Sequence, residues 1–215
     1  MAVAATGAIF LDRDGVINEN RPDHVKCWEE FDWLPNVLTS IRQLTETGLP
    51  IFVVTNQAIV NRGTISEMTL YDIHTRMLSL VNQAGGHIEK VYYCPHDKQE
   101  NCTCRKPQPG MLKLAAEEHN IDLTKSFIVG DAWTDMEAGL AVGATGILVM
   151  TGRGRGQGNF ARLLAHAAVR IGAACDLADA TTIILNVLNG EPMTATPRLR
   201  RAFHMALSPN ELTVL

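Results

Sequence analysis

Short apolar runs rich in Val, Ile and Phe alternate along this chain with longer segments in which apolar side chains recur at helical spacing. This alternation is typical of parallel βαβ units, in which each strand is followed by a helix that packs on the sheet. The short runs predict strands at residues 8–11, 50–55, 90–94, 126–130 and 146–150. The longer segments predict helices at residues 36–47, 66–84, 109–119, 134–142 and 177–188. The pattern therefore indicates an α/β fold built on a parallel sheet.

Local signals mark some of the helix boundaries. Ser66 is a predicted N-cap, because its hydroxyl can accept a hydrogen bond from a free N–H group of the first turn. Gly48 and Gly85 are predicted to end the helices before them, because glycine readily adopts the left-handed conformation that follows a helix.

Length and composition are typical of a soluble globular protein. A chain of 215 residues can bury a substantial core, and 46% hydrophobic and 20% charged residues are ordinary globular values. A formal net charge of −4 and a pI of about 6.0 disfavour binding to nucleic acid, which depends on basic surfaces. The apolar runs are shorter than the roughly 18 residues of a membrane helix, and residues 1–10 lack the basic start of a signal peptide. We expect a soluble protein without nucleic-acid or membrane partners.

Polar side chains follow three of the predicted strands at the point where each strand ends. These side chains are Asp12, Asn56 and Asp131. In open α/β sheets the ligand crevice lies just outside the carboxyl ends of the strands. We therefore expect the three side chains to converge at one edge of the sheet.

Two carboxylates stand two residues apart in Asp12-Arg13-Asp14-Gly15, directly after the first predicted strand. Carboxylates near a sheet interior repel one another unless a cation lies between them. Asp131 follows another strand in the same way, and Asp135 comes four residues later. Two carboxylates and a main-chain carbonyl from the first loop would suffice for Mg²⁺, which usually keeps several waters. A surface turn and helix N-capping remain open for these acids, and Asp135 is expected to orient Asp131 or a neighbour.

Two further segments offer groups that bind phosphate. Thr55 and Asn56 end a strand and provide a hydroxyl, an amide and main-chain N–H groups. Arg105 and Lys106 precede a predicted helix, and the prolines after them stiffen the approach to that helix. Lysine can neutralise a transferring phosphoryl group, and arginine can make a forked contact with a second anionic group. Taken alone, each segment is equally consistent with an ordinary polar or basic surface loop.

Three of the five cysteines and one histidine crowd into a short segment, as Cys94, His96, Cys102 and Cys104. Three thiolates and an imidazole form a tetrahedral set that suits zinc, in a loop with little apolar material to order it otherwise. Four protein ligands leave no open position for water, so we predict a structural zinc site that holds the loop at residues 94–109. Thiols clustered for a metal rather than for disulfides favour a reducing cytoplasm.

Four segments occur in a fixed order along the chain. They are Asp12-Arg-Asp-Gly15, the strand-end Thr55, Lys106 before a helix, and Gly130-Asp131 with Asp135. This set resembles the four motifs of phosphatases of the haloacid dehalogenase (HAD) superfamily, and the resemblance covers residues 8–150. The zinc segment with Arg105-Lys106-Pro107 is similar, more narrowly, to the branch that contains heptose-bisphosphate phosphatases and histidinol-phosphate phosphatases. The resemblance implies a Rossmann-like parallel sheet flanked by helices, without a large cap domain and with a zinc-binding loop.

The resemblance also implies roles for individual residues. Asp12 would be the nucleophile that takes the phosphoryl group, and Asp14 the general acid and then the general base. Magnesium would be held by Asp12, the Asp14 carbonyl and Asp131. The groups that bind phosphate or the rest of the substrate would be Thr55, Asn56, Arg105 and Lys106.

The implied function is magnesium-dependent hydrolysis of a sugar phosphate through an aspartyl-phosphate, with a bisphosphorylated heptose as the first candidate substrate. Histidinol phosphate and a nucleic-acid 3′-phosphate are alternative substrates, and a zinc-loop binding module on a degenerate hydrolase scaffold is an alternative from another class. Two segments depart from the heptose enzymes, which carry Asp-His-Gly-Tyr where this chain has residues 20–23, and a lysine where it has Ala132. Arg21 is expected to replace the lost positive charge, and Arg105 and Arg62 are expected to receive the distal phosphate of a bisphosphorylated sugar.

We expect one catalytic domain over residues 1–190 and a C-terminal extension over residues 191–215, acting as a monomer on a small molecule. The glycine-rich stretch at residues 152–158 is interpreted as a flexible loop, because Gln157 stands where a dinucleotide-binding fingerprint requires its third glycine. Several histidines are scattered without a partner pattern, and none is assigned to catalysis: His24, His74, His87, His119 and His166.

Overall fold

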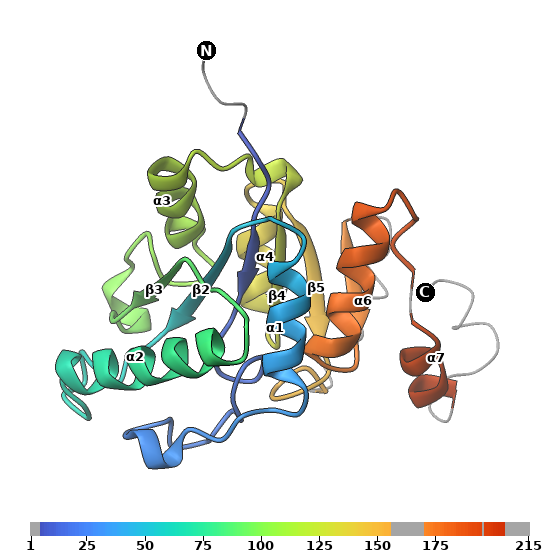
Figure 1. Cartoon of the computed structure of the whole chain (residues 1–215). Helices are drawn as coiled ribbons and strands as arrows, with labels where there is room; N and C mark the ends of the chain where they lie inside the picture. Colours follow the sequence, from blue (N-terminus) through green and yellow to red (C-terminus); the bar gives the residue numbers. More distant parts are fainter. Residues whose placement is uncertain (1–4, 156–169, 195, 205–215) are drawn as a thin grey trace.

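A single parallel sheet of six strands forms the centre of the protein in the computed structural model, which describes residues 5–155, 170–194 and 196–204 (Figure 1). The strand order is β3-β2-β1-β4-β5-β6, and every neighbouring pair is parallel. The strands are β1 (Ile9–Leu11), β2 (Ile51–Asn56), β3 (Lys90–Cys94), β4 (Phe127–Gly130), β5 (Thr145–Val149) and β6 (Ile171–Ala174). The five predicted strands and the parallel α/β fold are confirmed, whereas β6 was not predicted.

Helices cover both faces of this sheet. They are α1 (Val37–Thr45), α2 (Glu67–Gln83), α3 (Gly110–His119), α4 (Trp133–Leu140), α6 (Leu177–Leu188) and α7 (Pro197–His204). Short 3₁₀ helices lie at Trp28–Glu30, Lys98–Glu100 and Leu123–Lys125. The five predicted helices are confirmed to within a few residues at each end. Ser66 caps α2 by accepting a hydrogen bond from the Thr69 N–H at 3.0 Å, and Gly48 and Gly85 have positive φ angles after α1 and α2.

Alternation along the strands divides the core between the two faces. Ile9 and Leu11 pack with α1, α2 and α6 in one buried cluster, whereas Phe10 packs with α3 in another. This is the period-2 pattern of a strand buried on both sides, as expected inside a parallel sheet. The result is a layer of helices on each face and an edge of the sheet where the carboxyl ends of the strands are open.

Among the residues that the structure describes, no large cap domain interrupts the fold. The chain between β1 and α1, all of it described, contains only a three-residue 3₁₀ helix at Trp28–Glu30. Between β2 and α2 the chain forms turns without a helix or strand. The expectation of a domain without a large cap is therefore met, and only short loops surround the carboxyl ends of β1 and β2.

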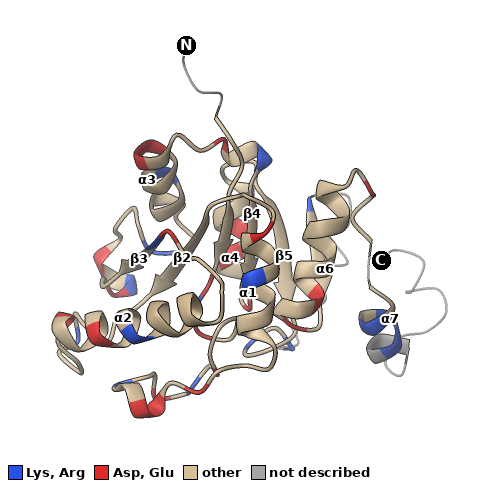
Figure 2. Cartoon of the chain, viewed as in Figure 1, with Lys and Arg blue, Asp and Glu red and all other residues tan. Residues whose placement is uncertain are grey.

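The C-terminal part packs against the sheet through α7. Leu199 is 1% exposed and joins a buried cluster with Trp133, Met136 and Leu148. Helix α7 carries basic residues (Figure 2), and its Arg198 makes a forked contact with Asp176, with Nη2–Oδ2 at 2.7 Å. Part of the glycine-rich stretch (residues 156–158), His166 and residues 205–215 lie outside the described residues. Within the described residues, no helix is long and apolar enough to cross a membrane.

Candidate active site

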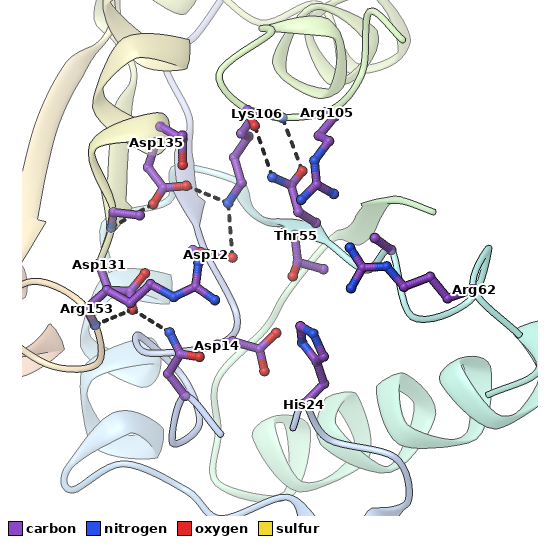
Figure 3. Close-up of a pocket in the computed structure, with 15 residues that line it drawn as sticks. Asp12, Asp14, His24, Thr55, Arg62, Arg105, Lys106, Asp131, Asp135 and Arg153 are labelled. Carbon is purple, nitrogen blue, oxygen red and sulfur yellow. Dashed lines mark hydrogen bonds and ion pairs between the residues drawn. The ribbon is translucent and has the colours of Figure 1, made fainter. Parts of the chain in front are cut away.

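A polar cavity of about 90 Å³ lies at the carboxyl ends of the central strands (Figure 3). Asp12 directly follows β1, Thr55 and Asn56 end β2, and Asp131 directly follows β4. Lys106 reaches the same place from the loop before α3. The residues that line the cavity are Asp12, Asp14, Asn20, His24, Thr55, Asn56, Ala58, Arg62, Arg105, Lys106, Asp131, Ala132, Thr134, Asp135 and Arg153. Strand order thus brings together side chains that are far apart in the sequence.

Lys106 is a buried cation held between two carboxylates. It is 4% exposed, and its Nζ lies 3.0 Å from Asp12 Oδ1 and 2.5 Å from Asp135 Oδ1. Its ammonium also donates a hydrogen bond to the Val54 carbonyl at 2.7 Å. Burial opposes the charge on Lys106, but Asp12 and Asp135 outweigh this effect and hold its pKa above the usual value. The ammonium is therefore fixed beside the Asp12 carboxylate.

Three buried carboxylates gather around this point, and their arrangement fits a divalent cation. Asp12, Asp131 and Asp135 each offer one oxygen, and these oxygens all lie within 4.8 Å of one another. Burial raises the pKa of Asp12 to about 8 and that of Asp131 to about 6, and in both cases the nearby carboxylates add to the increase. A single lysine leaves negative charge in excess here. Carboxylate oxygens are the hard ligands that Mg²⁺ prefers, so the donor set suits this ion.

Asp131 is packed closely against two glycines. A Cβ atom at Gly15 or at Gly152 would lie 2.1 Å from Asp131 Oδ2, so no side chain fits at either position. The same oxygen accepts hydrogen bonds from Asn20 Nδ2 at 2.9 Å and from the Arg153 main-chain N–H at 2.8 Å. The first loop and the loop after β5 therefore fix the orientation of this carboxylate.

The Asp14 carboxylate is turned toward donors beside the three-carboxylate cluster. Both of its oxygens lie 2.9 Å from Arg13 Nη2, and it also accepts from Asn18 Nδ2 at 2.9 Å and Gln57 Nε2 at 2.7 Å. Burial alone raises the pKa of Asp14, but Arg13 and these hydrogen bonds together bring the pKa below its usual value. Asp14 still lines the cavity next to Asp12.

Thr55 and Asn56, at the end of β2, make different contacts. Thr55 lines the cavity, and its hydroxyl accepts a hydrogen bond from Gln57 Nε2 at 2.9 Å. The Asn56 side chain instead holds the main chain of Lys106, because Nδ2 donates to the Lys106 carbonyl and Oδ1 accepts from its N–H, each at 3.1 Å. Both polar atoms of the Asn56 side chain thus hold the main chain of Lys106, and Asn56 also lines the cavity.

The predicted zinc ligands meet in the loop before α3. Cys94, His96, Cys102 and Cys104 each place a ligand atom within 4.8 Å of the others. Three sulfur–sulfur distances are 3.2 to 3.6 Å, near the roughly 3.8 Å edge of a tetrahedron with zinc–sulfur bonds of about 2.3 Å. The donor set therefore fits zinc. Arg105 is tied to this cluster, because its Nη1 donates to the His96 carbonyl at 2.9 Å.

Several side chains that line the cavity were not assigned to the site from the sequence, among them Asn20, His24 and Arg153, whereas Arg62 was expected there. Arg62 makes a forked contact with Asp97 of the zinc loop, at 2.6 and 2.7 Å. Arg21, which is expected to supply the positive charge missing at Ala132, places its Nε 3.4 Å from Asp23 Oδ1 and is not among the lining residues. Arg153 lines the cavity beside Asp131 instead, and its place in a glycine-rich loop gave no signal of this.

The fold and this site define a hydrolase of the HAD type. A family model described as HAD-hydrolase-like matches residues 103–173. A D-glycero-beta-D-manno-heptose-1,7-bisphosphate 7-phosphatase of Pseudomonas putida is 44% identical over 146 residues, which are 68% of this chain and 83% of the relative. The equivalent enzyme of Neisseria meningitidis is 40% identical over 147 residues, 68% of this chain and 79% of that one.

Solved structures agree with the sequence relatives. The D,D-heptose 1,7-bisphosphate phosphatase from B. bronchiseptica, complexed with magnesium and phosphate, superposes with a TM-score of 0.76 at 34% identity. The match covers 85% of this chain and 99% of that structure. The enzyme from Burkholderia thailandensis gives a TM-score of 0.62 at 29% identity, over 84% of this chain and 99% of its own. The chain belongs to the HAD-like hydrolases, together with these heptose-bisphosphate phosphatases.

Proposed function

We propose that this protein is a magnesium-dependent phosphatase that removes the 7-phosphate of D-glycero-β-D-manno-heptose 1,7-bisphosphate. The observation that carries the proposal is the meeting of Asp12, Asp14, Thr55, Lys106 and Asp131 around one cavity at the open edge of the sheet. Relatives that are 40 to 44% identical are named for this reaction, which supports the choice of substrate.

In the first half-reaction, Asp12 attacks the phosphorus in line, and the bond from phosphorus to the sugar oxygen breaks. Arg13, Asn18 and Gln57 hold Asp14 ionised in the free protein, so Asp14 must take up a proton as the substrate binds. It then gives this proton to the departing alkoxide, and the phosphoryl group remains on Asp12 as an acyl phosphate. Asp12 Oδ1 already accepts from the Arg13 N–H at 2.7 Å and pairs with Lys106, so we assign the attack to Oδ2. Lys106 and the Thr55 hydroxyl would stabilise the phosphoryl oxygens.

In the second half-reaction, Asp14 takes a proton from water, which attacks the same phosphorus and releases phosphate and free Asp12. Mg²⁺, held by Asp12, the Asp14 carbonyl and Asp131, would supply positive charge that neutralises the phosphoryl oxygens. Asp135 would act through others, because it pairs with Lys106 and its Oδ2 accepts the Ala132 N–H at 3.0 Å. One carboxylate thus serves both proton transfers, as the order of the two steps requires.

The distal phosphate of a bisphosphate needs cations away from the reacting centre. Arg62, Arg105 and Arg153 line the cavity in addition to Lys106, and Figure 3 shows Arg62 and Arg105 across the cavity from Asp131. A second cavity of about 440 Å³ adjoins the first and shares Arg105, Lys106 and Arg153 with it. We propose that the sugar and its distal phosphate occupy this shared region, since arginine favours forked contacts with phosphate.

Substrate choice is tested by comparing kcat/KM for three esters with Mg²⁺ present. We expect kcat/KM for heptose 1,7-bisphosphate to exceed kcat/KM for histidinol phosphate and for a 3′-phosphorylated oligonucleotide by at least tenfold. The reason is that the bisphosphate engages both Lys106 at the reacting phosphate and the arginines at the distal phosphate. An Arg105→Met variant should lower kcat/KM for the bisphosphate by roughly 10- to 100-fold, mainly through KM, since a forked charge-assisted contact contributes about 1.5–3 kcal/mol. A preference of the wild type for either other ester would overturn the substrate assignment.

We propose that the Cys94 cluster binds one structural zinc ion. Protein purified without chelator should carry about one zinc per chain, and Cys102→Ser should weaken zinc binding by at least the roughly 10- to 100-fold that loss of a second-shell partner costs. Because the loop carries Arg105 and Lys106, kcat/KM and the melting temperature should fall with zinc content. Cys27→Ser is the matched control and should change neither. Absence of zinc by metal analysis would contradict the site.

The zinc-loop binding module receives less support than the phosphatase. Its loop would have to face nucleic acid in a protein of net charge −4, whereas the catalytic acids and Lys106 are arranged around a cavity. A gel-shift assay with RNA separates the two functions, since we expect no shift at physiological salt.

We further propose that the protein acts in the cytoplasm as a monomer on a small molecule, in keeping with its acidic net charge and clustered thiols.

A further inference from the structure

A buried histidine lies behind the proposed acid and base. His74 sits on α2 and is 7% exposed, and its Nε2 lies 3.2 Å from Arg13 Nη1. Arg13 has 0% exposure, and its other terminal nitrogen, Nη2, contacts both oxygens of Asp14 at 2.9 Å. A chain of contacts thus runs from α2 through Arg13 to the carboxylate at the cavity.

The direction of the first hydrogen bond follows from chemistry. A guanidinium has only donors, so His74 Nε2 must accept, and the ring proton must reside on Nδ1. Burial, followed by the charge of Arg13, holds the pKa of His74 down to about 3, so the ring is neutral. Among the described residues, Arg13 Nε has no hydrogen-bond partner. His74 and Asp14 are therefore the groups that orient this buried guanidinium.

We propose that His74 is a positioning residue that fixes Asp14 through Arg13. The inference rests on the proposed function, in which Asp14 protonates the departing alkoxide and then activates water. Arg13 has no exposed surface and does not line the cavity, so it acts on the reaction only through its neighbours. Asn18 and Gln57 also hold Asp14, but neither reaches the terminal nitrogen that His74 engages.

Two substitutions at one position separate orientation from simple packing. His74→Leu fills similar space but removes the acceptor, which leaves Arg13 Nη1 buried without a partner. His74→Gln keeps an acceptor near the position of Nε2. If His74 acts through Asp14, the loss of the His74 acceptor should lower kcat/KM most for an ester whose leaving group needs a proton. The loss should be smallest for an ester whose leaving group needs none.

The test compares kcat/KM for heptose bisphosphate, whose alkoxide leaving group needs a proton, with p-nitrophenyl phosphate, whose phenolate does not. We expect His74→Leu to lower the first by roughly 10- to 100-fold, within the range for general acid catalysis, and the second by less than about threefold. KM should change little, and His74→Gln should recover most of the loss. Equal losses on both substrates, or no recovery by His74→Gln in a protein with a normal melting temperature, would overturn the proposal.

A second measurement does not depend on turnover. The ¹⁵N NMR spectrum of His74 in the wild type should show the neutral tautomer with the proton on Nδ1 at pH 7. A proton on Nε2 would exclude the bond to Arg13 and with it the proposal. If the wild type released phosphate from neither ester, the proposed function would fail, and the NMR result would still decide whether His74 holds Arg13.

Discussion

Replacement of the proposed nucleophile, Asp12→Asn, should reduce kcat by about 10⁴-fold or more, in line with the loss of a nucleophile in other enzymes. This corresponds to at least about 5.4 kcal/mol in the activation barrier. The substitution should not unfold the protein, because it removes charge from a buried site where Asp12 faces Asp131 and Asp135. Steady-state phosphate release with saturating Mg²⁺ measures the loss.

Thermal melting gives the same variant a second, independent readout. Without Mg²⁺, Asp12→Asn should melt close to the wild-type temperature, since burial already raises the pKa of Asp12 to about 8 and Lys106 keeps its pair with Asp135. Mg²⁺ should raise the melting temperature of the wild type more than that of the variant, because ligand binding to the folded state stabilises it. Asp32→Asn makes the same change at an exposed position and should leave both activity and the Mg²⁺ response intact. Near-normal turnover by Asp12→Asn would exclude the covalent mechanism.

The layout of the sheet could be predicted because its strands are buried on both faces. Runs such as Phe127-Ile-Val-Gly130 are apolar throughout and are bounded by polar residues, which identifies them without tertiary information. Strand β6 lacked this signal, because Ile171-Gly-Ala-Ala174 has only one residue with high strand propensity. Its place at the edge of the sheet beside β5 is decided by packing.

The acids of the site could be predicted, but several of its other lining residues and contacts could not. The acids after β1 and β4 follow strand ends, and parallel order alone brings such positions together. The contact between Asn56 and the Lys106 main chain joins residues fifty positions apart, and no local pattern encodes it. The sequence therefore predicts Asn56 near the phosphate, and only the structure shows that its amide also holds the loop that carries Lys106.

The position of His74 in the sequence indicated that its side chain is buried. It shares the buried face of α2 with Leu70, Met77 and Val81, at helical spacing. A histidine on an otherwise apolar stripe is a buried polar group, which needs a hydrogen-bond partner. The stripe thus predicts that His74 has a partner, but only the fold identifies Arg13 as that partner.

The buried ion pairs of Lys106 give the second large effect. Lys106→Met keeps the unbranched side chain up to its fourth heavy atom and removes the charged Nζ, so Asp12 and Asp135 are left buried without a cation. The free energy of unfolding should fall by about 3–5 kcal/mol, the cost of removing one partner from a buried pair. Because each kcal/mol corresponds to about 2–4 °C in a protein of this size, the melting temperature should fall by roughly 6–20 °C. Differential scanning calorimetry without Mg²⁺ measures this change.

A double variant separates the structural part of this effect from the catalytic part. Asp135→Asn in the Lys106→Met background removes one of the two unpaired carboxylates, so it should recover part of the lost stability. It should not recover turnover, because no ammonium remains beside Asp12 to stabilise the phosphoryl oxygens. Lys125→Met, which breaks an exposed pair with Asp122 at 3.2 Å, should cost less than about 1 kcal/mol. Recovery of activity together with stability would contradict a catalytic role for Lys106 and leave it as a purely structural cation.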